Sequence, residues 1–121
     1  MGGPVMHDIR SAESVRHWFE RAGHHDAPPE VQEHRLTVLA EFCRHFGRDP
    51  DELVAYCFLR KRDTGQRFCS VKRREEINRA LDAFAAEQGW TGKEAVVNAN
   101  IVRSHLIHNG VPIQGSVWTG S

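Results

Sequence analysis

The sequence lacks the features of a membrane or secreted protein. It has no apolar run near the roughly 20 residues that a membrane-spanning helix requires, and residues 1–10 lack the apolar core of a signal peptide. Its three cysteines, Cys43, Cys57 and Cys69, form no Cys-x-x-Cys pair, which argues against a disulfide framework or a zinc ribbon. We therefore expect a chain from a reducing, cytoplasmic setting with no membrane partner.

Catalytic signatures are also missing. The sequence has no nucleophile elbow, no phosphate-binding glycine loop and no His-Glu-x-x-His pattern. The acidic pairs at 51–52 and 75–76 fall in the first turns of expected helices, where carboxylates favour the helix dipole. His105 and His108 share a helical turn and could share a metal ion, but no third or fourth ligand is evident. We therefore expect no catalytic residue, no metal site and no cofactor.

The chain has no net charge, because 16 lysines and arginines balance 16 acidic residues. This balance excludes a uniformly basic nucleic-acid coat. The charges are unevenly placed, however: residues 1–59 carry a net −4, residues 60–79 a net +5 and residues 80–121 a net −1. A local cationic segment indicates an anionic partner, although a charge run on a linker can also be merely solvated.

Apolar periodicity predicts an all-α, compact bundle of four to five helices and no strand. The length of 121 residues fits one domain. Apolar side chains recur at helical spacing within five segments. We expect helices at about 11–22, 29–46, 49–59, 71–88 and 91–109, with a basic linker and a Thr64-Gly65 turn over 60–70.

Helix-terminus signals support these boundaries. Asp49 is followed by Pro50 and Glu52, which combines an acidic N-cap, a proline at the first helical position and a glutamate three residues after the cap. We expect Ser11 to cap the first helix. Thr91 and Glu94 are expected to form a second capping box.

The ordered motifs resemble a known DNA-binding domain, the N-terminal core-binding, SAM-like domain of phage integrases in the tyrosine recombinase family. The residues that carry the resemblance are Leu39 to Gly47, Asp49 to Leu53, the basic crossover, Ile77, Leu81 and Phe84, then Gly89, Thr91, Ile101 to His105 and Asn109 to Ile113.

The resemblance covers residues 29–113, leaving 1–28 as an N-terminal helix and linker and 114–121 as a tail or the start of a linker. In this family the domain forms half of a clamp around the recombination site and contacts mainly phosphates. The nucleophilic tyrosine belongs to a separate C-terminal catalytic domain. The resemblance thus implies binding to double-stranded DNA without strand cleavage, with a catalytic domain and other recombinase protomers as further partners.

We expect the DNA contacts to centre on residues 60–79, with the acidic N-terminal portion turned away. Replacing residues 72–74 by alanine should then weaken binding with little effect on thermal unfolding. The candidate DNA-binding residues are Arg60, Lys61, Arg62, Arg67, Lys72, Arg73, Arg74, Thr91, Lys93 and Arg103.

The alternative is a helical protein–protein interaction module that does not bind nucleic acid. Trp18, Phe19, Trp90 and Trp118 could then anchor a partner, because aromatic side chains are enriched at interface hot spots. The competing interpretation of Trp18, Phe19 and Trp90 is that they belong to the core of the bundle.

Overall fold

The structure is a computed structural model, and it describes residues 6–114. This range contains five α-helices, two short 3₁₀ helices (labelled η) and one two-stranded antiparallel sheet. The mostly helical fold confirms the expected class, whereas the sheet shows that the expectation of no strand was wrong. The elements are η1 (Met6–Ser11), α1 (Glu13–Ala22), η2 (His24–Asp26), α2 (Pro29–Phe46), α3 (Pro50–Tyr56), β1 (Phe58–Arg60), β2 (Arg67–Cys69), α4 (Val71–Gln88) and α5 (Gly92–Ile107).

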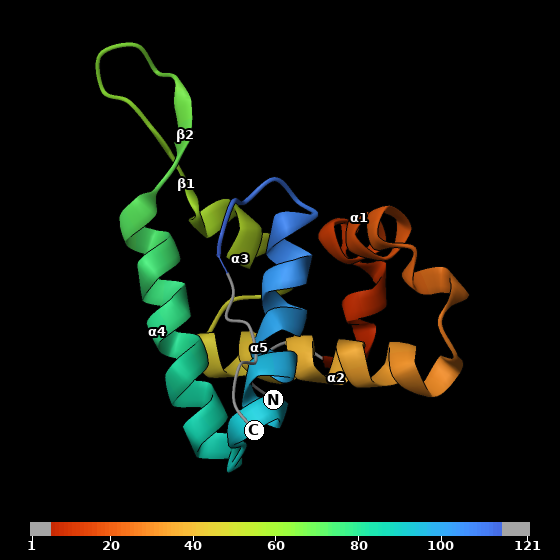
Figure 1. Cartoon of the computed structure of the whole chain (residues 1–121). Helices are drawn as coiled ribbons and strands as arrows, with labels where there is room; N and C mark the ends of the chain where they lie inside the picture. Colours follow the sequence, from red (N-terminus) through yellow and green to blue (C-terminus); the bar gives the residue numbers. More distant parts are fainter. Residues whose placement is uncertain (1–5, 115–121) are drawn as a thin grey trace.

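The helices pack around α2 and α5. Helix α2 crosses the molecule and contacts η1, α3, α4 and α5, while α1 packs against α3 and α5 (Figure 1). Helix α4 lies along the other side of α5. None of the helices within residues 6–114 combines the length and the apolar character needed to cross a bilayer.

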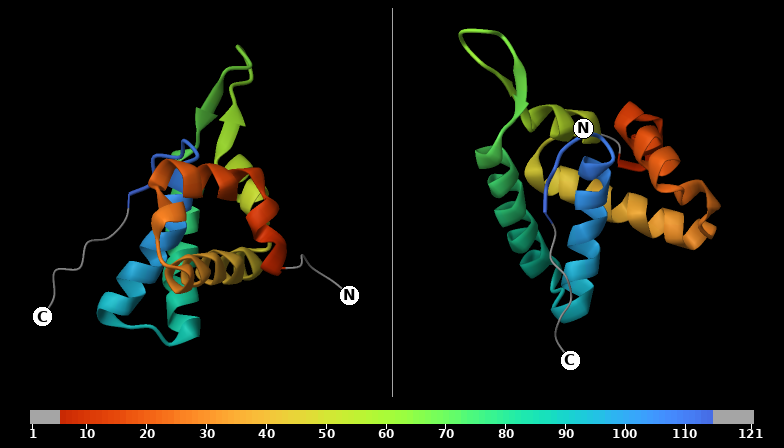
Figure 2. Two further views of the ribbon diagram at one scale, coloured as in Figure 1. Left: turned by 90° about the vertical axis from the view of Figure 1, so that its right-hand side faces the viewer. Right: turned by 45° about the horizontal axis from the view of Figure 1, so that its top comes forward.

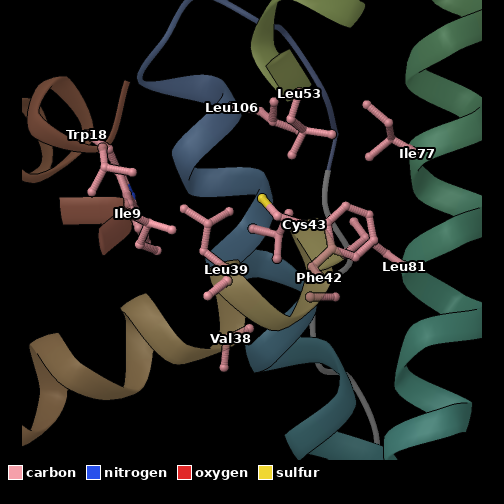
Figure 3. Packing of buried hydrophobic residues seen from close by; sticks show 14 of the residues in the cluster. Ile9, Trp18, Val38, Leu39, Phe42, Cys43, Leu53, Ile77, Leu81 and Leu106 are labelled. Carbon is pink, nitrogen blue, oxygen red and sulfur yellow. The ribbon is translucent and has the colours of Figure 1, made fainter. Parts of the chain in front are cut away.

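One hydrophobic core joins all five α-helices (Figure 3). Trp18, Leu39 and Leu53 are fully buried, and they come from α1, α2 and α3. Leu81 of α4 and Leu106 of α5 complete the same cluster. The N-terminal helix therefore belongs to the same core as the segment from 29 to 113.

Trp18 and Phe19 lie in this core, and Trp90 is half-buried with its ring centroid 5.3 Å from that of Phe84. The core interpretation of these three aromatics is therefore confirmed, and they offer no exposed anchor to a partner. Trp118 lies outside the described residues.

The capping signals differ in how well they predict the structure. The Asp49 side chain accepts a hydrogen bond from the Glu52 N–H at 2.8 Å, and Glu52 accepts one from the Asp49 N–H at 2.9 Å, so this capping box is confirmed. The expected cap at Ser11 is wrong, and Thr91 occupies the N-cap position of α5 as expected but does not form the expected capping box. Helix α1 begins after Ala12, and Thr91 precedes α5 without a side-chain hydrogen bond to it.

The segment after α3 differs most from the expectation. Helix α3 ends at Tyr56 rather than continuing to Leu59, and residues 58–60 pair with residues 67–69 as a β-hairpin. Phenylalanine favours extended structure, and the paired strand supplies backbone partners that a helix would otherwise provide. The expected basic linker is therefore an ordered hairpin that projects beyond the helices (Figure 2).

Candidate nucleic-acid interface

The hairpin is held by backbone hydrogen bonds from its base to its tip. At the base, the Ser70 N–H donates to the Cys57 carbonyl at 2.8 Å; near the tip, the Lys61 N–H donates to the Gln66 carbonyl at 2.9 Å. The Gly65 N–H closes the loop by donating to the Lys61 carbonyl at 2.8 Å. Gly65 has φ +71°, a left-handed conformation that glycine adopts without steric cost.

The register divides the hairpin side chains between two faces, because successive side chains of a strand point in opposite directions. The pairs Phe58–Cys69 and Arg60–Arg67 share one side, which we name the arginine face. The pair Leu59–Phe68 lies on the other side. Lys61 and Gln66 continue the same ladder by one step, so they join Leu59 and Phe68 on what we name the glutamine face.

On the arginine face, both guanidinium groups are engaged by the protein itself. Arg60 Nη1 donates to the Gly65 carbonyl at 3.0 Å. The Arg67 guanidinium lies 3.7 Å from the centre of the Phe58 ring, within the range of a cation–π contact. Arg67 also lines a shallow hollow of about 220 Å³ together with Glu13 and Asp51.

This hollow corrects the expectation that the acidic N-terminal portion is turned away from the cationic segment. Glu13 belongs to α1 and Asp51 to α3, and both carboxylates lie on the side of the hairpin that carries Arg67. The acidic groups lower the positive potential of the arginine face. The two carboxylates therefore offset part of the charge of Arg60 and Arg67 on this side of the hairpin.

The glutamine face is largely exposed. Lys61, Gln66 and Phe68 are exposed and Leu59 is partly exposed. Phe68 retains 39% of its surface and is one of four exposed large apolar side chains among the described residues. Arg62 is exposed at the tip between the two strands.

The start of α4 contributes fewer available cations than its sequence suggests. Lys72 is exposed. Arg73 Nη1 donates to the Tyr56 carbonyl at 2.9 Å, and its guanidinium also lies 4.3 Å from the centre of the Tyr56 ring. Arg74 Nη1 donates to the Pro112 carbonyl at 2.6 Å. Arg73 and Arg74 thus connect elements of the fold, and the expectation that their removal would leave unfolding almost unchanged is not supported by these contacts.

Two further candidates lie away from the hairpin. Thr91 and Lys93 are exposed, but they flank the start of α5, beyond the far end of α4. Eighteen helical residues separate the ends of α4, and at 1.5 Å per residue this is about 27 Å. The structure therefore does not bring Thr91 and Lys93 together with the hairpin cations.

Arg103 is buried, with 5% of its surface exposed. Its Nε donates to Asn78 Oδ1 at 2.8 Å and its Nη1 to Asn100 Oδ1 at 2.9 Å. Burial lowers the pKa of the Arg103 guanidinium. Arg103 consequently joins α5 to α4 inside the protein, and its placement among surface phosphate contacts was wrong.

The histidine pair on the last helix is also divided between separate contacts. His105 is fully buried with Nε2 3.0 Å from Ser14 Oγ, whereas His108 Nδ1 lies 2.8 Å from the Ser104 carbonyl. Burial lowers the pKa of His105 to about 3. Within residues 6–114, no group of three or more histidine, cysteine, aspartate or glutamate side chains is arranged to hold a metal ion.

Tyr56 is the only tyrosine in the sequence. Its hydroxyl donates to Glu76 Oε1 at 2.6 Å, and this hydrogen bond is the main cause of its raised pKa. The guanidinium of Arg48 lies 4.1 Å from the centre of the Tyr56 ring, across from that of Arg73. A phenol with a raised pKa is a poor nucleophile near neutral pH.

Comparison of the chain with protein-family models, with curated proteins and with solved structures finds no match.

Sequence reasoning located the cationic segment but missed Gln66 and Phe68. Both lie in the segment that the sequence predicts to be a linker, and without a regular repeat the direction of a side chain cannot be predicted. The alternation Leu59–Lys61 and Gln66–Phe68 around a Gly65 turn was the signal that could have revealed a two-faced hairpin.

Proposed function

We propose that this chain binds double-stranded DNA through the hairpin and the start of α4, as a core-binding domain of an integrase-like site-specific recombinase. The observation that carries the proposal is the projecting hairpin, whose exposed residues 60–67 include four cations and one acidic residue. A further exposed cation near the hairpin, Lys72, lies at the start of α4.

Concentrated exposed cations on a protruding element match the phosphate backbone of DNA, which carries a dense line of negative charge. Phosphate contacts of this kind set the position of a protein on a duplex. The hairpin projects clear of the helices in all views, so a duplex can approach it without meeting the helical body first (Figures 1 and 2).

The recombinase part of the proposal rests on the ordered motifs of residues 29–113. In that setting, strand cleavage belongs to a catalytic domain other than this one. Tyr56 fits the same division, since its hydroxyl is bound to Glu76 and its pKa is raised. A catalytic domain and other protomers would complete the clamp around the DNA.

The test is equilibrium binding of a labelled duplex at several salt concentrations. For about three to five phosphate contacts, log K should fall with log salt at a slope of about −3 to −4.5. No binding at low salt, or an affinity that ignores salt, would overturn the proposal.

A pair of matched variants locates the contact. The double change Lys61→Ala and Arg62→Ala should weaken binding and reduce the slope by about 2. The control carries Arg16→Ala and Arg44→Ala, which removes the same charge from exposed positions on α1 and α2. Equal losses in the two doubles would show that binding follows net charge rather than the hairpin.

A further inference from the structure

The hairpin is a short two-stranded β-ribbon, which is one of the elements that the major groove of DNA admits. The ladder extends over four residue pairs, from Phe58–Cys69 to Lys61–Gln66, and at about 3.4 Å per residue it is about 14 Å long. The major groove is about 12 Å wide and admits a two-stranded β-ribbon. The two faces of the ribbon would then meet different surroundings, since only one can point to the base edges.

The arginine face is poorly suited to the base edges. Arg60 is bonded to the Gly65 carbonyl and Arg67 lies over Phe58. Glu13 and Asp51 lie beside Arg67 and would approach the phosphates if this side turned toward DNA. Placing carboxylates near a phosphate backbone is unfavourable.

The glutamine face carries chemistry that reads base edges. A glutamine amide pairs with N6 and N7 of adenine, and an aromatic side chain contacts the C5-methyl group of thymine. Gln66 and Phe68 are exposed two positions apart on the same strand side. Lys61, opposite Gln66, is placed to reach a flanking phosphate with its long side chain.

We propose that the glutamine face enters the major groove and that Gln66 and Phe68 select A·T base pairs there. This inference rests on the proposed DNA binding and assigns it a groove and two specificity-determining residues. Phe68 contacts the thymine methyl group, Gln66 pairs with adenine, and Lys61 and Arg62 bind the phosphates that border the groove.

The test begins with selection of duplexes by the full chain from a random library. The selected site is then remade with deoxyuridine for thymidine, which removes only the C5-methyl group, or with 7-deazaadenine for adenine, which removes N7. At least one position should lose about fivefold or more in affinity for each replacement, because both groups lie in the major groove.

Variants assign these losses to residues. The Phe68→Ala variant should bind the thymidine site more weakly than the wild-type chain does, and it should bind the thymidine and deoxyuridine sites with equal affinity. The Gln66→Ala variant should likewise bind the adenine site more weakly, and it should bind the adenine and 7-deazaadenine sites with equal affinity. The controls Ile107→Ala and Gln88→Ala change exposed side chains away from the hairpin, and they should keep the preferences of the wild-type chain.

The outcomes separate the inference from the proposed function. Three results would overturn the inference and leave the proposed function intact. They are salt-dependent binding with no base preference, no effect of either base replacement on the affinity, or displacement of the protein from DNA by a minor-groove ligand. Absence of binding to any duplex at low salt would overturn both. The base replacements use the unaltered protein, so the test does not depend on the folding of a variant.

Discussion

His105 and Ser14 form a buried contact between α5 and α1, with Nε2 3.0 Å from the hydroxyl oxygen. The Asp51 carboxylate accepts the Ser14 N–H at 2.9 Å, and hydrogen bonds from Ser14 lower the pKa of Asp51 although burial alone would raise it. Because the Ser14 hydroxyl also donates a hydrogen bond to the Asp51 carboxylate, its oxygen is available to accept one from the Nε2–H of a neutral His105. The Nδ1 atom of His105 is buried without a hydrogen-bond partner among the described residues.

This arrangement predicts loss of stability in mild acid. The pKa of His105 is about 3 in the folded chain against its ordinary value of 6.5, so the unfolded chain binds the proton first. The contribution of neutral His105 to the free energy of unfolding is complete above about pH 6.5. It decreases by about 1.4 kcal/mol per pH unit as the pH falls toward the folded pKa. Urea unfolding should therefore show a loss of about 2 kcal/mol between pH 6.5 and pH 5.

The matched variants for this prediction are His105→Gln and His24→Asn. Burial also lowers the pKa of His24, although His24 is less buried. The acid sensitivity should be greatly reduced in His105→Gln and largely kept in His24→Asn. The same pH dependence in His105→Gln as in the wild-type chain would contradict the assignment.

Two substitutions at the start of α4 remove equal charge but should affect stability differently. Arg73→Ala should lower the free energy of unfolding by about 1–2 kcal/mol, because it removes the hydrogen bond to the Tyr56 carbonyl and a cation–π contact. Lys72→Ala removes the same charge from an exposed side chain and should change the free energy of unfolding by less than about 0.5 kcal/mol. Thermal or urea unfolding measures both, and equal effects would show that the Arg73 contacts contribute nothing.

Arg103 is predicted to matter for folding rather than for DNA. Arg103→Met should destabilise the chain by about 1–3 kcal/mol, since Asn78 Oδ1 loses its buried donor. The slope of log K against log salt should stay unchanged at temperatures where the variant is folded. A reduced slope would place Arg103 in contact with a phosphate after all.

Gly65 is predicted to matter for DNA binding rather than for folding. Gly65→Ala forces a side chain into a left-handed conformation at φ +71°, which costs about 1 kcal/mol. A cost of this size should lower the melting temperature by only a few degrees, whereas DNA affinity falls because the loop loses its conformation. Asn at this position tolerates the conformation, and Gly65→Asn should therefore retain more affinity than Gly65→Ala. Equal affinities of the two variants would exclude backbone strain as the cause.

Local rules in the sequence predicted the parts of the fold that local interactions decide. The Asp49–Glu52 capping box formed as expected because both partners lie within one turn. Helices α2 and α4 have the expected bounds for a similar reason, since their apolar spacing and terminal glycines act over a few residues.

The hairpin and Arg103 could not be predicted in this way. Phe58 and Leu59 continue an apolar run that also suits a helix, and the choice of strand depends on pairing with residues 67–69 across a loop. Arg103 follows the buried Val102, and only packing of α5 on α4 brings Asn78 to its guanidinium. Both outcomes depend on contacts between segments that are distant in the sequence.

All the hydrogen bonds described for residues 61–66 stay within the hairpin, whereas the core residues lie in other segments and in the hairpin base. Mutations at the tip can therefore accumulate without unfolding the protein. Under the DNA binding proposed above, exchange of this short loop would change the preferred DNA sequence while the helices that hold it keep the stability of the fold.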